Sequence, residues 1–174
     1  MITMANSSLD PTITTVPMDP DDTVIDLRDR TTRIGKVQRH RSHLQDAMAG
    51  LEASLRRPAE HPGDWLADVT RQLAELAGAL ESHIYVHEGP DSFHADVLRG
   101  RPHLTPLVAS LQRDHQRLSQ DVDHLMRFLM EHTPIDERDV RARGLALIHQ
   151  FARHRERGAD LVWEAFNVDI GGET

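Results

Sequence analysis

Hydrophobic and polar residues follow the period of an α-helix in four segments of the chain. In each segment, apolar side chains recur at steps of three and four residues, which places them on one helical face. The predicted helices span about 29–55, about 64–88, the stretch from Thr105 to the break at Thr133–Pro134, and about 136–168. The alternation typical of β-strands is almost absent, so the pattern predicts an all-α protein.

Proline and glycine separate these segments. The Pro62–Gly63 pair precedes the second helix, Gly89–Pro90 ends it, and Gly171–Gly172 follows the last helix. Four helices joined by short connections pack best as an antiparallel bundle. We therefore expect an up-down-up-down four-helix bundle over residues 25–174. Residues 1–24 are rich in Pro, Ser, Thr and Asp and lack an apolar period, so we expect a disordered tail there.

Composition excludes several kinds of chemistry. The 174 residues include no cysteine, which rules out disulfides, thiolate nucleophiles, iron–sulfur clusters and cysteine-type zinc sites. The net charge of −8 argues against a nucleic-acid partner. The chain has no apolar run of the ~20 residues that a membrane span needs, and its first residues do not resemble a signal peptide. We expect a soluble, cytoplasmic protein without a membrane partner, and the sequence leaves a homodimer open.

Histidine is the informative excess, with twelve in the chain. Each helical residue advances by ~100°, which converts spacing into direction. In the second predicted helix, the apolar series ending at Leu80 continues at His83 and His87, and Glu88 lies at the edge of the same face. In the fourth, His154 lies within the apolar stripe, and Gly158 leaves space one turn further on.

The first and third predicted helices each contribute one more inward histidine. His40 precedes Leu44 by one turn, whereas His43 lies near the rim and stays an alternative. His115 lies on the inner side of its helix with Asp114 beside it. In an antiparallel bundle these inward histidines fall within ~20 Å of one shared end. We expect surface positions for the remaining histidines and for two acidic residues: His61, His94, His103, His124, His132, His149, Glu156 and Asp160.

Several inward imidazoles at one level predict a metal site. Burying that many without partners costs several kcal/mol in total. A metal ion resolves this cost because it binds neutral imidazole. The predicted ligands are His40, His83, His87, Glu88, His115 and His154. The alternative is a hydrogen-bonded histidine layer, with His87 and Glu88 in solvent at the end of their helix.

This pattern resembles the hemerythrin-like (HHE cation-binding) domain family. The matching motifs are the first-helix histidine, His83 with Glu88, His115 in RDHQRL, and His154 in ARHRERGAD. The segments HEGPDSF and RHRERGADLVWEAFNVDIGGE resemble an actinobacterial subgroup, and the likeness covers about residues 36–173. It implies a four-helix bundle that holds a non-haem di-iron centre with histidine and carboxylate ligands. It also implies a small diatomic or peroxide ligand (O2, NO or peroxide), with roles in sensing, oxidative-stress defence or iron handling.

The chain departs from the family pattern in three places. The spacing from His83 to Glu88 is five rather than four, so His87 stands where the motif has glutamate. Ser119 stands where a second histidine of the third helix is found, and the fourth helix has no acidic residue at the expected offset. Two ions need bridging carboxylates. The site therefore holds either one ion or two with an unusual ligand set, and the imidazole-rich set also suits zinc.

Other functions stay open from the sequence alone. Turnover of peroxide would make the protein an enzyme, and nothing in the sequence selects that. A metal-free helical interaction module explains the leucine stripes but leaves the inward histidines unexplained. A hydrolytic metalloenzyme is weaker because HExxH is absent, and nothing favours haem. We expect Tyr85 and Trp163 to contribute to the surroundings of the metal or to pack in the core.

Overall fold

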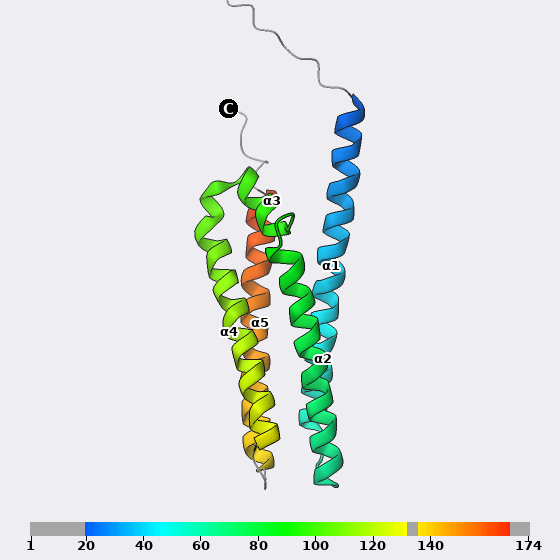
Figure 1. The fold of residues 1–174 in the computed structure, drawn as a ribbon, viewed down its shortest axis with the longest axis vertical. Helices are drawn as coiled ribbons and strands as arrows, with labels where there is room; N and C mark the ends of the chain where they lie inside the picture. The colour runs from blue at the N-terminus through cyan, green and yellow to red at the C-terminus, as the bar shows by residue number, and fades with distance from the viewer. Residues whose placement is uncertain (1–19, 132–135, 168–174) are drawn as a thin grey trace, which may run out of the picture. The chain divides into compact units, whose positions relative to one another are not determined.

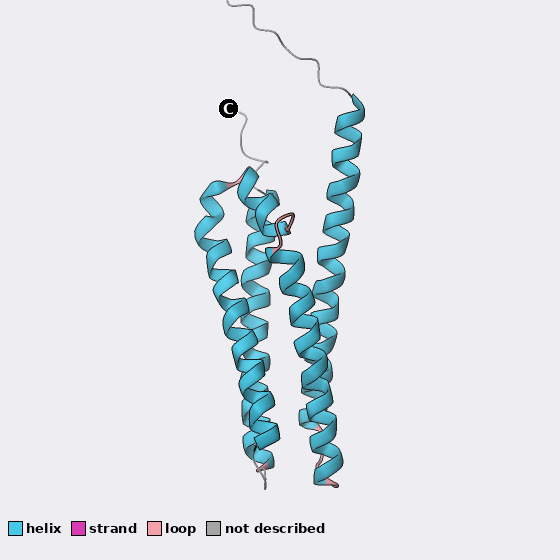
Figure 2. Cartoon of the chain, viewed as in Figure 1, coloured by secondary structure: helices cyan, strands magenta, loops and turns pink. Residues whose placement is uncertain are grey.

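The computed structural model describes residues 20–131 and 136–167, with backbone alone for 20–34, 36, 37, 166 and 167. These residues form five α-helices and one short 3-10 helix, and no strand occurs among them (Figure 2). The all-α prediction is therefore confirmed. The elements in chain order are α1 (Pro20–Arg56), α2 (Pro62–Glu88), α3 (Phe93–Gly100), η1 (Pro102–Leu104), α4 (Thr105–Glu131) and α5 (Glu137–Asn167).

Two boundaries differ from the sequence predictions. Helix α1 begins at Pro20, so residues 20–24 of the predicted tail are helical, while residues 1–19 lie outside the described part. The connector before Thr105 contains α3 and η1. The Ser92 hydroxyl accepts a hydrogen bond from the Ala95 backbone N–H at 3.3 Å, which caps the start of α3.

The chain divides into two compact units, residues 1–32 and residues 33–174. In the first unit, the described residues 20–32 are the beginning of α1. In the second, Figure 1 shows α2, α4 and α5 side by side, with α4 running opposite to α2 and α5. The 33–56 part of α1 contributes to the same core as these helices. The predicted helical stripes therefore meet inside this unit.

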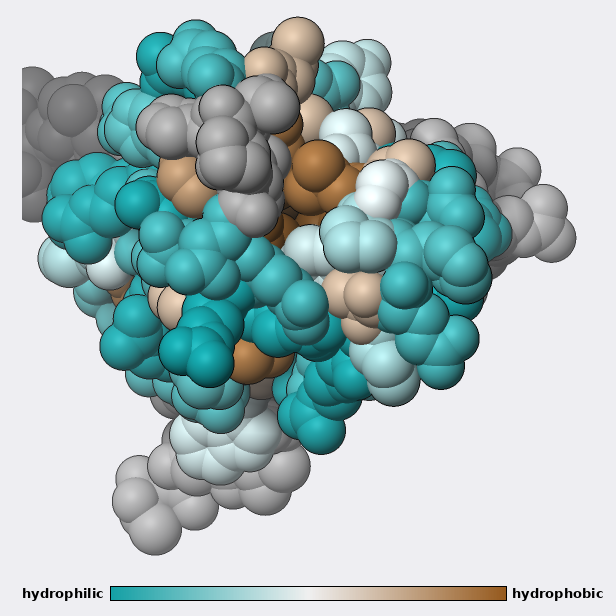
Figure 3. Space-filling model, turned by 90° about the horizontal axis from the view of Figure 1, so that it is seen from below, coloured by the Kyte–Doolittle hydropathy of each residue, from teal (hydrophilic) through white to brown (hydrophobic). Residues whose placement is uncertain are grey.

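The larger apolar cluster joins the second half of α1, most of α2, the second half of α4 and the first half of α5. Fully buried members include Leu51, Leu73 and Phe151. The indole N–H of Trp65 donates to the Ser54 carbonyl at 3.0 Å, so this large side chain is buried without losing its polar partner. Among the described residues, no helix is long and apolar enough to cross a membrane. Figure 3 shows polar residues around one end of the molecule and apolar ones between them.

A smaller apolar cluster lies where α3 and η1 meet the start of α4 and the end of α5. It contains Val97, Leu104, Leu111 and Leu161, among others. On α4, His115 falls between Leu111 of this cluster and Leu118 of the larger one. On α5, His154 likewise falls between Phe151 and Leu161. The buried histidines thus separate two apolar clusters.

Candidate metal centre

Three imidazoles from three helices converge in the interior. His83 of α2, His115 of α4 and His154 of α5 are all buried. Nε2 of His154 lies 3.1 Å from Nε2 of His115 and 3.3 Å from Nε2 of His83. One ligand atom from each residue lies within 4.8 Å of the others. The structure therefore brings together three of the six ligands predicted from the sequence.

Glu88 acts on this group through His115 rather than joining it. Its Oε1 lies 2.5 Å from Nδ1 of His115, so we infer that this nitrogen carries the proton and donates to the carboxylate. The Nε2 lone pair of His115 then faces His154. Partial burial raises the pKa of Glu88 above its ordinary value. A carboxylate that holds the second nitrogen of a histidine is a common support of metal-bound imidazole.

Asp114 is committed to an arginine. Its Oδ2 accepts from Nε of Arg157 at 2.8 Å and also from Nη2 of the same guanidinium. The same oxygen lies 3.8 Å from Nδ1 of His154, beyond hydrogen-bond distance but close enough to orient that ring electrostatically. Nδ1 of His154 and Nδ1 of His83 have no hydrogen-bond partner among the described residues. Asp114 is therefore a neighbour of the histidine group and not one of its members.

Two further histidines, His87 and His94, lie next to the converging three. Nδ1 of His87 donates to the His83 carbonyl at 2.8 Å, and the two rings stack at a centroid distance of 4.0 Å. The hydrogen bond occupies Nδ1 and leaves the Nε2 lone pair of His87 available. His94 of α3 is only 3 % exposed and lies parallel to the His115 ring at 6.1 Å. Nδ1 of His94 has no partner in the part of the chain that the structure describes.

The surface position predicted for His94 is wrong. Its segment looked like a connector because Gly89–Pro90 and Gly100 flank it. A short helix forms there because Ser92 caps it and Val97 packs into the smaller apolar cluster. The sequence carried this signal as Ser92 followed by FHADVL, where His94 and Val97 are three residues apart on one face.

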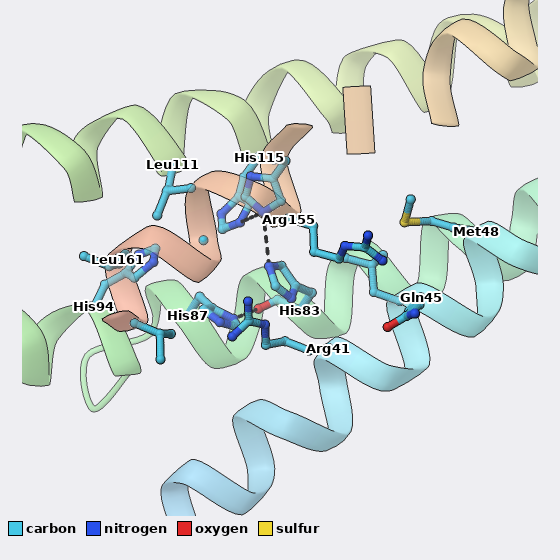
Figure 4. Close-up of a pocket in the computed structure, with 14 residues that line it drawn as sticks. Arg41, Gln45, Met48, His83, His87, His94, Leu111, His115, Arg155 and Leu161 are labelled. Atoms are coloured by element: carbon cyan, nitrogen blue, oxygen red, sulfur yellow. Dashed lines mark hydrogen bonds between the residues drawn. The ribbon is translucent and has the colours of Figure 1, made fainter. Parts of the chain in front are cut away.

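Helix α1 presents an arginine to the site instead of the predicted histidine. His40 is half-buried and does not line the cavity beside the converging imidazoles, and His43 is exposed. Arg41 lines that cavity, together with Leu44, Gln45 and Met48. The inward series in α1 runs 41, 44, 48, 51, 55, so His40 lies about 100° to one side. Figure 4 shows Arg41 and Gln45 on α1 and His83 and His87 on α2 around one space.

The surroundings keep the imidazoles neutral. Burial is the main cause, and it lowers the pKa of His87, His115 and His154 to about 4 and that of His94 to about 3. The pKa of His83 is lowered most, first by burial and then by the neighbouring imidazoles. At neutral pH all five rings are therefore in the form that binds metal ions.

Most of the remaining residues singled out in the sequence lie on the surface. Tyr85 is 81 % exposed and Trp163 is 64 % exposed, so the expectation that they surround the metal or pack in the core is wrong. Ser119 is half-buried. Gly158 lines the cavity, and a Cβ there would meet no atom within 4 Å, as expected from the sequence. His132 lies outside the described residues, and the other residues predicted at the surface are exposed: His61, His103, His124, His149, Glu156 and Asp160.

Two pairs of the converging nitrogens have the spacing of ligands to a single metal ion. Two imidazole nitrogens bound tetrahedrally at about 2.0–2.1 Å from one ion are about 3.3 Å apart, close to the 3.1 and 3.3 Å seen here. The adjoining cavity has a volume of about 30 Å³. Hydrogen bonds within the group cannot satisfy all three rings, because Nε2 of His154 has at most one proton to donate and two neighbouring nitrogens. The donor set is therefore more consistent with a cation than with a purely hydrogen-bonded layer.

No family model, curated protein or solved structure matches the chain.

Proposed function

We propose that this protein binds one metal ion through His83, His115 and His154 within the helical core. The observation that carries the proposal is the meeting of three buried, neutral imidazoles from α2, α4 and α5, with Nε2 atoms 3.1 and 3.3 Å apart. Borderline divalent metals such as iron(II) and zinc favour this kind of nitrogen donor. The support from Glu88 to His115 strengthens the same interpretation.

Non-haem iron is the metal we propose, in the manner of hemerythrin-like proteins. A single ion fits better than an iron pair, since Glu88 is bonded to His115 and Asp114 to Arg157. Neither carboxylate is free to bridge two ions. Zinc is the alternative favoured by a specific observation, because three histidines with an open fourth position form a familiar zinc donor set.

The proposed role is to bind a small molecule such as O2, NO or peroxide for sensing, stress defence or iron handling. When bound, iron supplies an open coordination position and a change of oxidation state. The protein's own residues perform the remaining tasks. Glu88 fixes the single proton of neutral His115 on Nδ1, and burial keeps the rings neutral. Leu111 and Leu161 give the cavity an apolar part of its lining.

Elemental analysis with an absorption spectrum tests the proposal. We expect close to one iron or zinc per chain in protein prepared with both metals available. His83→Ala with His154→Ala should remove it, because two of three ligands are lost. The matched control is His124→Ala with His149→Ala, two exposed histidines on α4 and α5, which should keep the metal. Charge-transfer bands would indicate ferric iron, whereas zinc would be silent.

A metal-free helical interaction module is the competing function. Protein that stays metal-free under replete conditions, and folds equally well with both ligand substitutions, would contradict the proposal and favour the module.

A further inference from the structure

The cavity beside the histidines has a positively charged side. Arg41 of α1 and Arg155 of α5 both line it, together with the amide of Gln45. None of its 14 lining residues is acidic, although the whole chain has a net charge of −8. Figure 4 shows both arginines beside the imidazoles, with Arg41 next to His87. Positive charge is therefore concentrated locally, against the overall charge of the protein.

Arg41 and Arg155 differ from nearby Arg157 in lacking a counter-ion among the described residues. Within the described residues, neither forms an ion pair or a side-chain hydrogen bond. Arg157, two residues further along α5, is bound to Asp114. Five other arginines also have carboxylate partners: Arg56, Arg57, Arg71, Arg99 and Arg141.

The arginine charges act on each other and on the histidines. Burial, and then the charge of Arg155, lowers the pKa of Arg41. Arg41 in turn disfavours protonation of His83 and His87. Unpaired like charges beside a partly enclosed space are unfavourable unless an anion joins them. A guanidinium presents a fork of N–H donors that matches a two-oxygen anion.

We infer that Arg41 and Arg155 form a binding site for a small oxyanion, of the carboxylate or nitrite type, next to the metal position. Gln45 supplies a further amide donor at the same cavity. The inference rests on the proposed function in one respect: a metal ion at the three histidines adds positive charge and tightens anion binding. The arginine pair itself is independent of the metal.

Calorimetric titration with sodium nitrite and with sodium formate tests the inference. It is performed at low ionic strength on metal-free and metal-loaded full-length protein. We expect saturable binding that is tighter with metal, and a loss of at least about tenfold in affinity in Arg41→Gln/Arg155→Gln. The matched control is Arg39→Gln/Arg153→Gln, which removes two exposed arginines from the same two helices and should bind like the unchanged protein. Both double variants should keep their metal content and helical circular dichroism.

The outcomes distinguish failure of the anion site from failure of the metal proposal. The double variant binding as tightly as the unchanged protein, or metal-loaded protein without saturable binding, overturns the anion site and leaves the metal proposal standing. Arginine-dependent binding by a protein that takes up no metal supports the anion site and overturns the proposed function. Arg155→Gln alone, at an exposed position, should weaken binding in the same direction and guards against a folding defect in the double variant.

Discussion

The larger apolar cluster and the histidine group lie on the same faces of the same helices but depend on different conditions. Leu73 and Phe151 stabilise the fold simply because their side chains are removed from water. His83, His115 and His154 are also buried and carry nitrogens with too few partners. The stability that the apolar cluster supplies should therefore depend little on pH, whereas the histidine layer would gain stability from a bound cation and should lose it in acid.

The largest effect should be a loss of stability when the metal-free protein is acidified, because it acts on the histidine group and not on the apolar cluster. Buried His87, His115 and His154 have a pKa of about 4 when folded, against about 6.5 for unfolded histidine. The unfolded chain thus binds more protons between these values, so stability is full above pH 6.5 and falls toward pH 4. Each histidine contributes at most ~1.4 kcal/mol per pH unit.

Urea unfolding at several pH values measures this loss. Substituting glutamine for exposed His61 and His103 should leave the profile unchanged. A free energy of unfolding that stays level from pH 7 to pH 4.5 would contradict the expected acid sensitivity.

Leu73→Ala should have the next largest effect, and it tests the apolar side of the comparison. Leu73 is completely buried in the larger cluster, so its truncation should lower the free energy of unfolding by about 2–5 kcal/mol. Metal affinity should change little. Met130→Ala, at a residue that is 75 % exposed, is the control and should be nearly neutral in the same urea titration. If Leu73→Ala lost metal without losing stability, the apolar cluster would not be the source of stability that is distinct from the metal site.

Glu88→Gln should have the smallest effect and sharpen the histidine side of the comparison. Removing the charge that holds Nδ1 of His115 should weaken metal binding by about 10–100-fold with little change in metal-free stability. Competition with a chelator of known affinity measures this. Glu81→Gln, an exposed position on the same helix, is the control. Unchanged affinity in Glu88→Gln would mean that the carboxylate does not support the ligand.

Helical periodicity was enough to predict the all-α class and the burial of His83, His87, His115 and His154. It works on α2, α4 and α5 because each has an uninterrupted apolar series that fixes the phase of the helix. On α1 the series is weaker near His40, and a shift of one residue, about 100°, brings Arg41 to the cavity instead.

What periodicity could not supply was contact between helices. The bond from Glu88 to His115 joins residues 27 apart in the chain, and no local pattern encodes it. His94 was missed because glycine and proline around α3 hid a two-turn helix. The arginines were missed because a charge run is ordinarily a solvated face. Only the three-dimensional arrangement shows that Arg41 and Arg155 line the cavity, without carboxylate partners in the described part of the chain.

The separation of the two apolar clusters by a polar layer has a consequence for local opening. The terminal assembly of α3 and η1 packs on the smaller cluster, beyond the histidines. Without an ion, amide hydrogens there should exchange with solvent through partial unfolding that leaves the larger cluster closed. An ion bound by α2, α4 and α5 would hold these three helices together, so the cellular metal supply would set how often this end of the molecule opens locally.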